Sequence, residues 1–379
     1  MEYVELHCHS NYSFYDGASF VDELLVTAKQ LAYPALALTD HDNLCGSMEF
    51  SHVAKRLDIK PIIGVEISLE GNQHITLLSK NIEGYRNISR LLSHSQMESR
   101  SGRLDNEQLF KYKDGLIALS DCRENGLNID IQNHNQQKIN NILTNYMDAF
   151  GKENFFVELH QNLVKGDVQR NKILSEHARY LGLDTVATNN VHYHVQERSK
   201  LQDVLVAIKN NTSLDECSRH LRFNNHFYLK SAEEMQYLFA SYPNAIRNTL
   251  KIAEMCEFNL MQDIGYSFPD YDVPEGYSQQ SYLEQICIEA ARRKYGSISN
   301  KVNLRLEEEF RLIKKHDLAG FLLIYHDIIE LAREVMIDLK LTDIEIPLEE
   351  RSPGRGRGSS VAMLVGYLIG LSHIDPLEY

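Results

Sequence analysis

The sequence predicts an α/β fold: a closed or nearly closed seven-stranded barrel, followed by a mostly helical part. Seven short apolar runs alternate with segments of helical spacing over about the first 195 residues. Strands that alternate with helices indicate a parallel sheet. Seven such units in one domain favour a barrel over an open sheet. The runs cover residues 3–7, 35–39, 62–68, 75–79, 116–120, 155–160 and 185–188.

Helical spacing and a proline-rich stretch predict the domain organisation. In the first part, helices are expected at 21–31, 47–57 and 168–181, and 197–260 is expected to be helical. Pro269, Pro274 and Gly276 mark a linker. We therefore expect a first domain over 1–265, with the barrel at about 1–195 and a helical extension at about 196–265. After a linker at 266–277, a second domain covers 278–379, with helices near 278–295, 304–316 and 321–337.

Composition restricts the class of protein. None of the apolar runs approaches the ~20 residues that a membrane span needs. The six cysteines are scattered without a C-x-x-C pair, which is typical of a reduced, cytoplasmic protein. A net charge of −14 argues against indiscriminate coating of nucleic acid. Even so, three arginines gather at Arg351, Arg355 and Arg357.

Metal-ligating residue types recur at the predicted strand ends. His7 and His9 are two residues apart at the end of the first run, so their side chains should share a face. Active sites of α/β barrels lie at the carboxyl ends of the strands. His74 instead begins a run, which an antiparallel or edge strand would explain. Similar side chains at the other strand ends are His41, Glu66, Cys122, Glu158, His160, His192 and His194.

These side chains together point to metal-dependent phosphoester chemistry. Imidazoles suit zinc, iron or manganese, and bridging carboxylates suit a site with several ions. Such ions polarise a phosphoryl oxygen and supply a hydroxide. Taken singly, each histidine would more often be an ordinary packed or surface residue, and it is the repeated placement at strand ends that favours a metal site. Asp40, beside His41, is a candidate for orienting that imidazole.

A glycine-arginine segment at 353–360 is the second candidate site. Its glycines allow close backbone approach, and Ser359 can cap a helix that starts at Val361. Arginines beside helix N–H groups would suit a triphosphate or a DNA phosphate. The G-K-[ST] ending of a Walker loop is missing. A flexible basic loop is the alternative interpretation.

The order of motifs resembles the alpha subunit of bacterial C-family DNA polymerases. The first part resembles its polymerase-and-histidinol-phosphatase (PHP) domain, and the last part the start of its palm. The PHP-like motifs are L-H-C-H-S-x-x-S-F-x-D-G (6–17), A-L-T-D-H (37–41), G-V-E (64–66), H-x-x-L-L (74–78), I-A-L-S-D-C (117–122) and V-A-T-N-N-V-H-Y (186–193). The palm-like motifs are G-F-L-L-I-Y-H-D-I-I (320–329), G-R-G-S-S (356–360) and G-L-S-H-I-D-P-L (370–377). The opening motif and the short G-x-G-S form are similar to the error-prone branch.

The resemblance implies a set of site residues. Gly358 and Ser359, with Arg357, would contact the phosphates of an incoming nucleotide. At position 190 the family has aspartate, whereas Asn190 brings no charge and cannot act as a base. The implied ligands of a zinc, manganese or iron site, which the change at 190 could leave vestigial, are His7, His9, Asp16, His41, Glu66, His74, Cys122, Asn190 and His192.

The resemblance also implies the function. We expect the N-terminal portion of a DNA-directed DNA polymerase for replication or error-prone repair, which would use DNA, deoxynucleotides and Mg²⁺ as a complete enzyme. The family's P-D-x-D-x-D-F motif is absent from these residues, so the chain alone should not polymerise DNA. Partners would be the remaining polymerase domains, or a split-polymerase partner, and other replication or repair proteins.

Two alternatives stay open. One is a stand-alone metal-dependent phosphoesterase or 3′–5′ exonuclease, against which the palm-like residues 320–379 argue. The other is a non-catalytic PHP scaffold, which Asn190 favours over a hydrolase. An incomplete palm should also expose apolar surface along 321–329 and 361–371.

Overall fold

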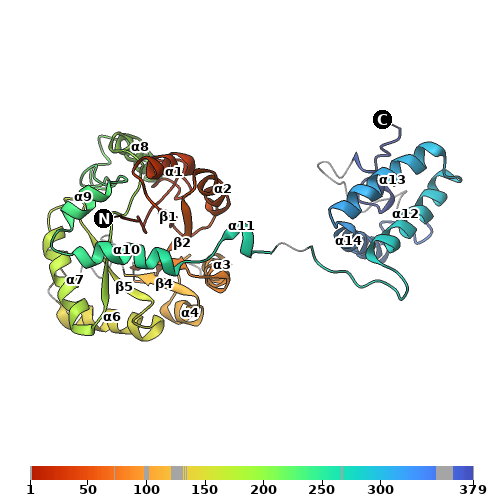
Figure 1. The fold of residues 1–379 in the computed structure, drawn as a ribbon. Coiled ribbons are helices and arrows are strands. Elements are labelled where there is room, and N and C mark those ends of the chain that lie inside the picture. The colour runs from red at the N-terminus through yellow and green to blue at the C-terminus, as the bar shows by residue number, and fades with distance from the viewer. Residues whose placement is uncertain are drawn as a thin grey trace. The chain divides into compact units, whose positions relative to one another are not determined.

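The computed structural model describes residues 2–71, 73–97, 102–120, 131, 133, 135–265, 268–346 and 362–378. The chain divides into two compact units, Met1–Gly265 and Tyr266–Tyr379, and each is described separately (Figure 1). Among the helices of the described residues, none combines the length and the apolar character that a membrane span requires.

The first unit is built on a curled six-stranded sheet in sequential order. Its strands are β1 (Ala35–Leu38), β2 (Lys60–Leu69), β3 (Gln73–Ser79), β4 (Leu116–Leu119), β5 (Phe155–His160) and β6 (Asp184–Thr188). These confirm six of the seven predicted strands. β3 runs antiparallel to both β2 and β4, and the other pairs are parallel. His74 therefore begins its strand at the edge where the parallel strands end.

The remaining predicted strand, at residues 3–7, is wrong as a regular element. This segment makes only isolated bridges, from Glu5 to Leu36 on one side and from Cys8 to Val191 on the other. Val191 N donates to His7 O at 2.8 Å, and His9 N donates to Val191 O at 2.8 Å. Because its few pairs are divided between two neighbours, neither ladder is continuous. The segment nevertheless joins β1 to the chain that follows β6, which closes the curled sheet.

Helices cover the outside of this sheet (Figure 1). α1 (Val21–Gln30) precedes β1. The helices between the strands are α2 (Ser47–Leu57), α3 (Ile82–Met97), α4 (Asn106–Lys111), α6 (Gln136–Phe150) and α7 (Asp167–Leu181). The predictions at 21–31, 47–57 and 168–181 agree within one residue. α7 ends at Gly182, whose φ of 69° is the left-handed conformation that commonly terminates a helix.

The predicted helical extension is only partly helical. After the short 3₁₀ turn η1 (Gln196–Arg198) come α8 (Ser199–Lys209), α9 (Ala232–Leu238), α10 (Pro243–Met255) and α11 (Leu260–Asp263). Residues 210–231 form no helix. This irregular segment is held to the barrel by Phe227 O, which accepts from His192 N at 2.9 Å. It therefore lies beside the chain that follows β6.

An inner apolar layer fills one end of the barrel. The inner layer includes Ile62, Ile117 and Phe156, near the amino ends of their strands. Ile252 of α10, and Cys256 directly after this helix, pack into the same layer. Apolar side chains and α10 fill that end, and the cluster of buried histidines and carboxylates lies at the opposite end, where the parallel strands finish.

The second unit is helical. Its elements are α12 (Gln279–Tyr295), α13 (Asn300–Lys315), α14 (Ala319–Asp338) and α15 (Leu364–Leu368). They confirm the helices predicted near 278–295, 304–316 and 321–337. Glu309 is buried, and its carboxylate accepts from the backbone N–H groups of Leu364 and Val365 at 2.9 and 2.8 Å. This pairing attaches α15 to α13.

The apolar exposure of the second unit agrees with the expectation only in part. On α14, Ile328 and Leu331 are 56% and 62% exposed, and Val335 and Leu339 follow at helical spacing. Along 321–329 the expectation is confirmed only for Phe321, Tyr325 and Ile328, because Leu322, Leu323 and Ile329 are buried. For Leu364–Ile369 the expectation is wrong, because these residues are buried in the core with α12 and α13.

We predict that Leu323→Ala destabilises the second unit by about 2–5 kcal/mol, since its side chain is fully buried. The matched control, Ile328→Ala on the same helix, should change the free energy of unfolding by about 0.5 kcal/mol or less. Urea unfolding followed by circular dichroism measures both. Equal effects of the two variants would contradict the burial described for α14.

We also predict that residues 1–379 associate more strongly than residues 1–265. The cause is the exposed apolar stripe formed by Ile328, Leu331, Val335 and Leu339. Light scattering at matched concentrations compares the two chains. Two equally monodisperse samples would show that this stripe does not drive association.

Candidate metal centre

Glu66 of β2 lies at the centre of the buried polar cluster. Its Oε2 atom is 3.3 Å from His7 Nε2, 3.3 Å from His9 Nε2 and 3.1 Å from His41 Nδ1. Its Oε1 atom is 3.1 Å from His74 Nδ1. Four imidazoles that are up to 67 positions apart in the chain therefore surround one carboxylate.

This arrangement contains two neighbouring sets of three ligand atoms. His7, His9 and Glu66 form one set, and His41, Glu66 and His74 form the other, each with its ligand atoms within 4.8 Å of one another. Glu66 belongs to both, as a bridging carboxylate would. Nitrogen-rich sets with a shared carboxylate suit zinc, manganese or iron. The residues present therefore fit a centre for two neighbouring divalent ions.

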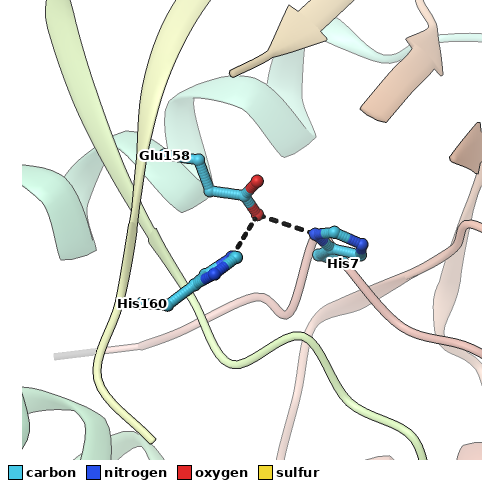
Figure 2. Close-up of side chains that lie close together, drawn as sticks. All are labelled: His7, Glu158 and His160. Carbon is cyan, nitrogen blue, oxygen red and sulfur yellow. Dashed lines mark hydrogen bonds and ion pairs between the residues drawn. The ribbon is translucent and has the colours of Figure 1, made fainter. Parts of the chain in front are cut away.

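Glu158 of β5 orients His7. Its Oε1 atom lies 2.9 Å from His7 Nδ1 and 3.1 Å from His160 Nε2, and it accepts from the hydroxyl of Thr188. Figure 2 shows the carboxylate between the two imidazoles. A carboxylate on one ring nitrogen fixes the tautomer and leaves the other for a metal. His7 therefore presents Nε2 toward Glu66. The sequence predicted that Glu158 and His160 lie at a strand end, but the ligand set implied by the family resemblance includes neither residue.

Asp16 makes an equivalent contact with His41. Its Oδ2 atom lies 2.8 Å from His41 Nε2, which leaves Nδ1 facing Glu66. Asp16 also accepts from Gln202 Nε2 at 3.2 Å and from Arg222 Nη2 at 3.1 and 3.3 Å. Neither Gln202 nor Arg222 was anticipated. They come from α8 and the irregular 210–231 segment, and no local motif marks them.

Asn190 and His192 complete the cluster on the side of His9. Asn190 Oδ1 lies 3.2 Å from His9 Nε2, and the His192 ring stacks on the His9 ring at 4.5 Å between centroids. Asn190 has a φ of 45°, a left-handed conformation that asparagine tolerates better than most residues. Its side chain therefore supports His9 but adds no negative charge.

Asp40 acts on His9 rather than directly on His41. The buried carboxylate accepts from Ser10 N–H at 2.7 Å and from the Ser13 hydroxyl at 2.6 Å. Ser13 Oγ in turn lies 3.2 Å from His9 Nδ1 and accepts from the His41 backbone N–H at 3.1 Å. Asp40 thus holds the loop that supports both histidines, which differs from the direct contact expected.

Burial and close charges divide the imidazoles into two electrostatic classes. Burial opposes protonation of His7, but Glu158 and Glu66 outweigh it and raise its pKa to about 10. Burial, with the nearby His41 charge, lowers the pKa of His9 to about 4. Burial alone would raise the pKa of Glu66, yet His41 and His7 hold it well below its usual value. His9 is thus neutral at physiological pH, the state that a metal ligand requires.

A cavity of about 470 Å³ opens beside the cluster at Asp16, His41 and His74. Its wall also contains cationic or titratable side chains, namely Arg103, Lys209, His220 and Arg222. Positive groups at the mouth of a metal-ligating cluster favour an anionic ligand.

Some expected residues lie elsewhere. His194 contacts Ser19 Oγ at 2.7 Å and Glu23 at 3.9 Å instead of Glu66. Cys122, and the expected phosphate-binding residues Arg357, Gly358 and Ser359, lie outside the described residues.

Comparison with known proteins connects this geometry to a family. Residues 5–162 match the family described as PHP domain, and residues 281–379 match the one described as Bacterial DNA polymerase III alpha NTPase domain. The DNA polymerase III subunit alpha of Treponema pallidum is 33% identical over 396 aligned positions, which cover 100% of this chain and 33% of that protein. The error-prone DNA polymerase of Symbiobacterium thermophilum is also 33% identical, over 100% of this chain and 35% of that protein.

Similarity to solved structures is more distant. An amidohydrolase from Chromobacterium violaceum shares 19% identity at a TM-score of 0.36, over 50% of this chain and 87% of that chain.

The chain spans about a third of the length of the curated relatives it matches. Both relatives match across the whole of this chain, and its two family matches follow one another in the order expected from the motifs. The resemblance drawn from the motifs is therefore confirmed. Over its whole length, the chain is homologous to bacterial DNA polymerase III alpha subunits and error-prone DNA polymerases.

Proposed function

We propose that this chain is the N-terminal portion of a DNA-directed DNA polymerase of the DNA polymerase III alpha type. The supporting observation is the 33% identity to two such polymerases across the whole chain. In this proposal residues 1–265 are the PHP unit and 278–379 begin the palm. The complete enzyme would use DNA, deoxynucleotides and Mg²⁺ in cytoplasmic replication or repair synthesis, with Arg357, Gly358 and Ser359 on the nucleotide phosphates.

The PHP unit, in the same proposal, binds divalent zinc, manganese or iron. His7, His9, His41, Glu66 and His74 have the geometry for it. Asp16, Cys122, Asn190 and His192 complete the proposed set. Bound ions would polarise a phosphoryl oxygen and lower the pKa of a coordinated water. Glu158 and Ser13 would hold the rings of His7 and His9 in position for such ions.

A metal-dependent phosphoesterase or 3′–5′ exonuclease activity of the PHP unit is the second candidate. The observation in its favour is the cavity beside His41 and His74, whose wall includes Arg103 and Lys209 in a chain of net charge −14. Asn190 argues against it, because an amide cannot act as a base. A PHP unit that binds metal but serves only as a scaffold for polymerase domains is the third possibility.

We predict that Glu66→Gln sharply reduces metal binding, because it removes the carboxylate shared by both ligand sets. The loss of affinity should exceed the ~10–100-fold typical of outer-shell changes. Plasma mass spectrometry after dialysis against Mn²⁺ or Zn²⁺ measures bound metal per chain. The control is His52→Ala, an exposed histidine of α2. Equal metal content in Glu66→Gln and the wild type would refute this centre.

We further predict that the chain alone shows no primer extension, since residues 1–379 lack the P-D-x-D-x-D-F motif whose aspartates would hold Mg²⁺. Extension by the purified chain would contradict the polymerase-part assignment. In parallel, a 5′-labelled single strand with Mn²⁺ tests the second candidate. Shortening of the strand that disappears in His9→Ala would establish the nuclease. An intact DNA strand, together with metal bound to the protein, would favour the third possibility, in which the PHP unit serves only as a scaffold.

A further inference from the structure

The guanidinium of Arg222 lies between two residues of the proposed ligand set. Its Nη2 atom is 3.1 and 3.3 Å from the two oxygens of Asp16 and 3.2 Å from His192 Nδ1. Asp16 Oδ2 and His192 Nδ1 are themselves 3.3 Å apart. A carboxylate oxygen and an imidazole nitrogen at this spacing could bind a common ion. In this chain the positive charge between them belongs to an arginine.

Packing holds Arg222 firmly in this place. Its side chain is only 9% exposed, and its guanidinium carbon lies 4.8 Å from the centre of the Phe227 ring. The carbonyl of Phe227 accepts from the backbone N–H of His192. The segment that carries Arg222 is therefore attached by backbone hydrogen bonding to the chain that carries His192. This is a preorganised contact and not a loose surface ion pair.

Asp16 is already saturated with donors. Oδ1 accepts from Gln202 and Arg222, and Oδ2 faces His41 Nε2, His192 Nδ1 and Arg222. An ion bound here would have to displace several of these groups. Glu66 differs, because its close contacts in the cluster are imidazoles that can themselves ligate the same ions.

Asn190 makes the same part of the cluster less anionic. Position 190 belongs to the proposed ligand set, and its amide contributes no charge. Divalent ions bind where carboxylates neutralise them. A fixed guanidinium and a neutral amide act in the same direction, since neither supplies the negative charge that attracts a metal ion to this corner.

We propose that Arg222 is a built-in cation that takes the place of one metal ion between Asp16 and His192. Asp16 then serves as a positioning residue that orients His41, as Glu158 orients His7. This inference rests on the proposed metal-binding function. The centre keeps its ions at the two ligand sets around Glu66 and binds one ion fewer than it would with a neutral residue at 222.

The test is the number of Mn²⁺ ions bound per chain in three proteins. Arg222→Ala frees Asp16 and His192, so it should bind one more ion than the wild type. Arg222→Lys keeps a cation at the site and should bind the same number as the wild type. Equilibrium dialysis with plasma mass spectrometry counts the ions. As a second readout, Mn²⁺ should raise the melting temperature of Arg222→Ala more than that of the wild type.

Each outcome decides between the two proposals. Equal, non-zero counts in the wild type and Arg222→Ala would overturn the role of Arg222 and leave the metal centre intact. A metal-free wild type would overturn the proposed metal centre. If Arg222→Ala then also bound none, the role of Arg222 would fail with it. If Arg222→Ala does not fold by circular dichroism, Arg222→Gln, which is neutral but keeps a donor for Asp16, replaces it with the same expected count.

Discussion

The backbone pairing of residues 5–9 with both edges of the curled sheet is the constraint on which the candidate metal centre depends. On one side, Ala37 N donates to Glu5 O. On the other side, Val191 N donates to His7 O, and His9 N donates to Val191 O. This pairing places the first two histidines of the chain beside Glu66 and beside Asn190 and His192. Without this pairing, His7 and His9 would not connect Glu66 to Asn190 and His192.

The cluster is costly to bury and is supported accordingly. Buried carboxylates and imidazoles are destabilising unless each finds a partner. Here Glu158 and Asp16 each accept from a ring nitrogen that faces away from Glu66. Asp40 accepts from the hydroxyl of Ser13, which in turn lies beside His9 Nδ1. The nitrogens nearest Glu66 are thereby aimed at one carboxylate before any ion arrives, which is the preorganisation that a metal centre needs.

The antiparallel strand β3 explains how His74 joins this centre. In a wholly parallel sheet, a residue at the start of a strand would lie at the apolar end that α10 fills. Because β3 is reversed, Ser68 pairs with His74 and Glu66 pairs with Thr76. His74 therefore lies within reach of Glu66 on the same face of the sheet. The reversal adds one candidate ligand to the polar end, and the inner apolar layer at the other end is preserved.

Local pattern determined much of this protein without the fold. Strand-end position identified His7, His9, His41 and Glu66, because the carboxyl ends of neighbouring parallel strands must meet, whereas His74 was implied by the resemblance. The order of the motifs identified the family. Only the tertiary structure decided that residues 5–9 bridge β1 and the chain that follows β6 without forming a strand, and that Leu364–Ile369 are buried.

The tertiary structure also decided which residues position the ligands. Glu158 meets His7 across 151 positions, and Arg222 meets Asp16 across 206. Such pairs leave no trace in local spacing, since each forms only when the closed barrel and the 210–231 segment bring distant residues together.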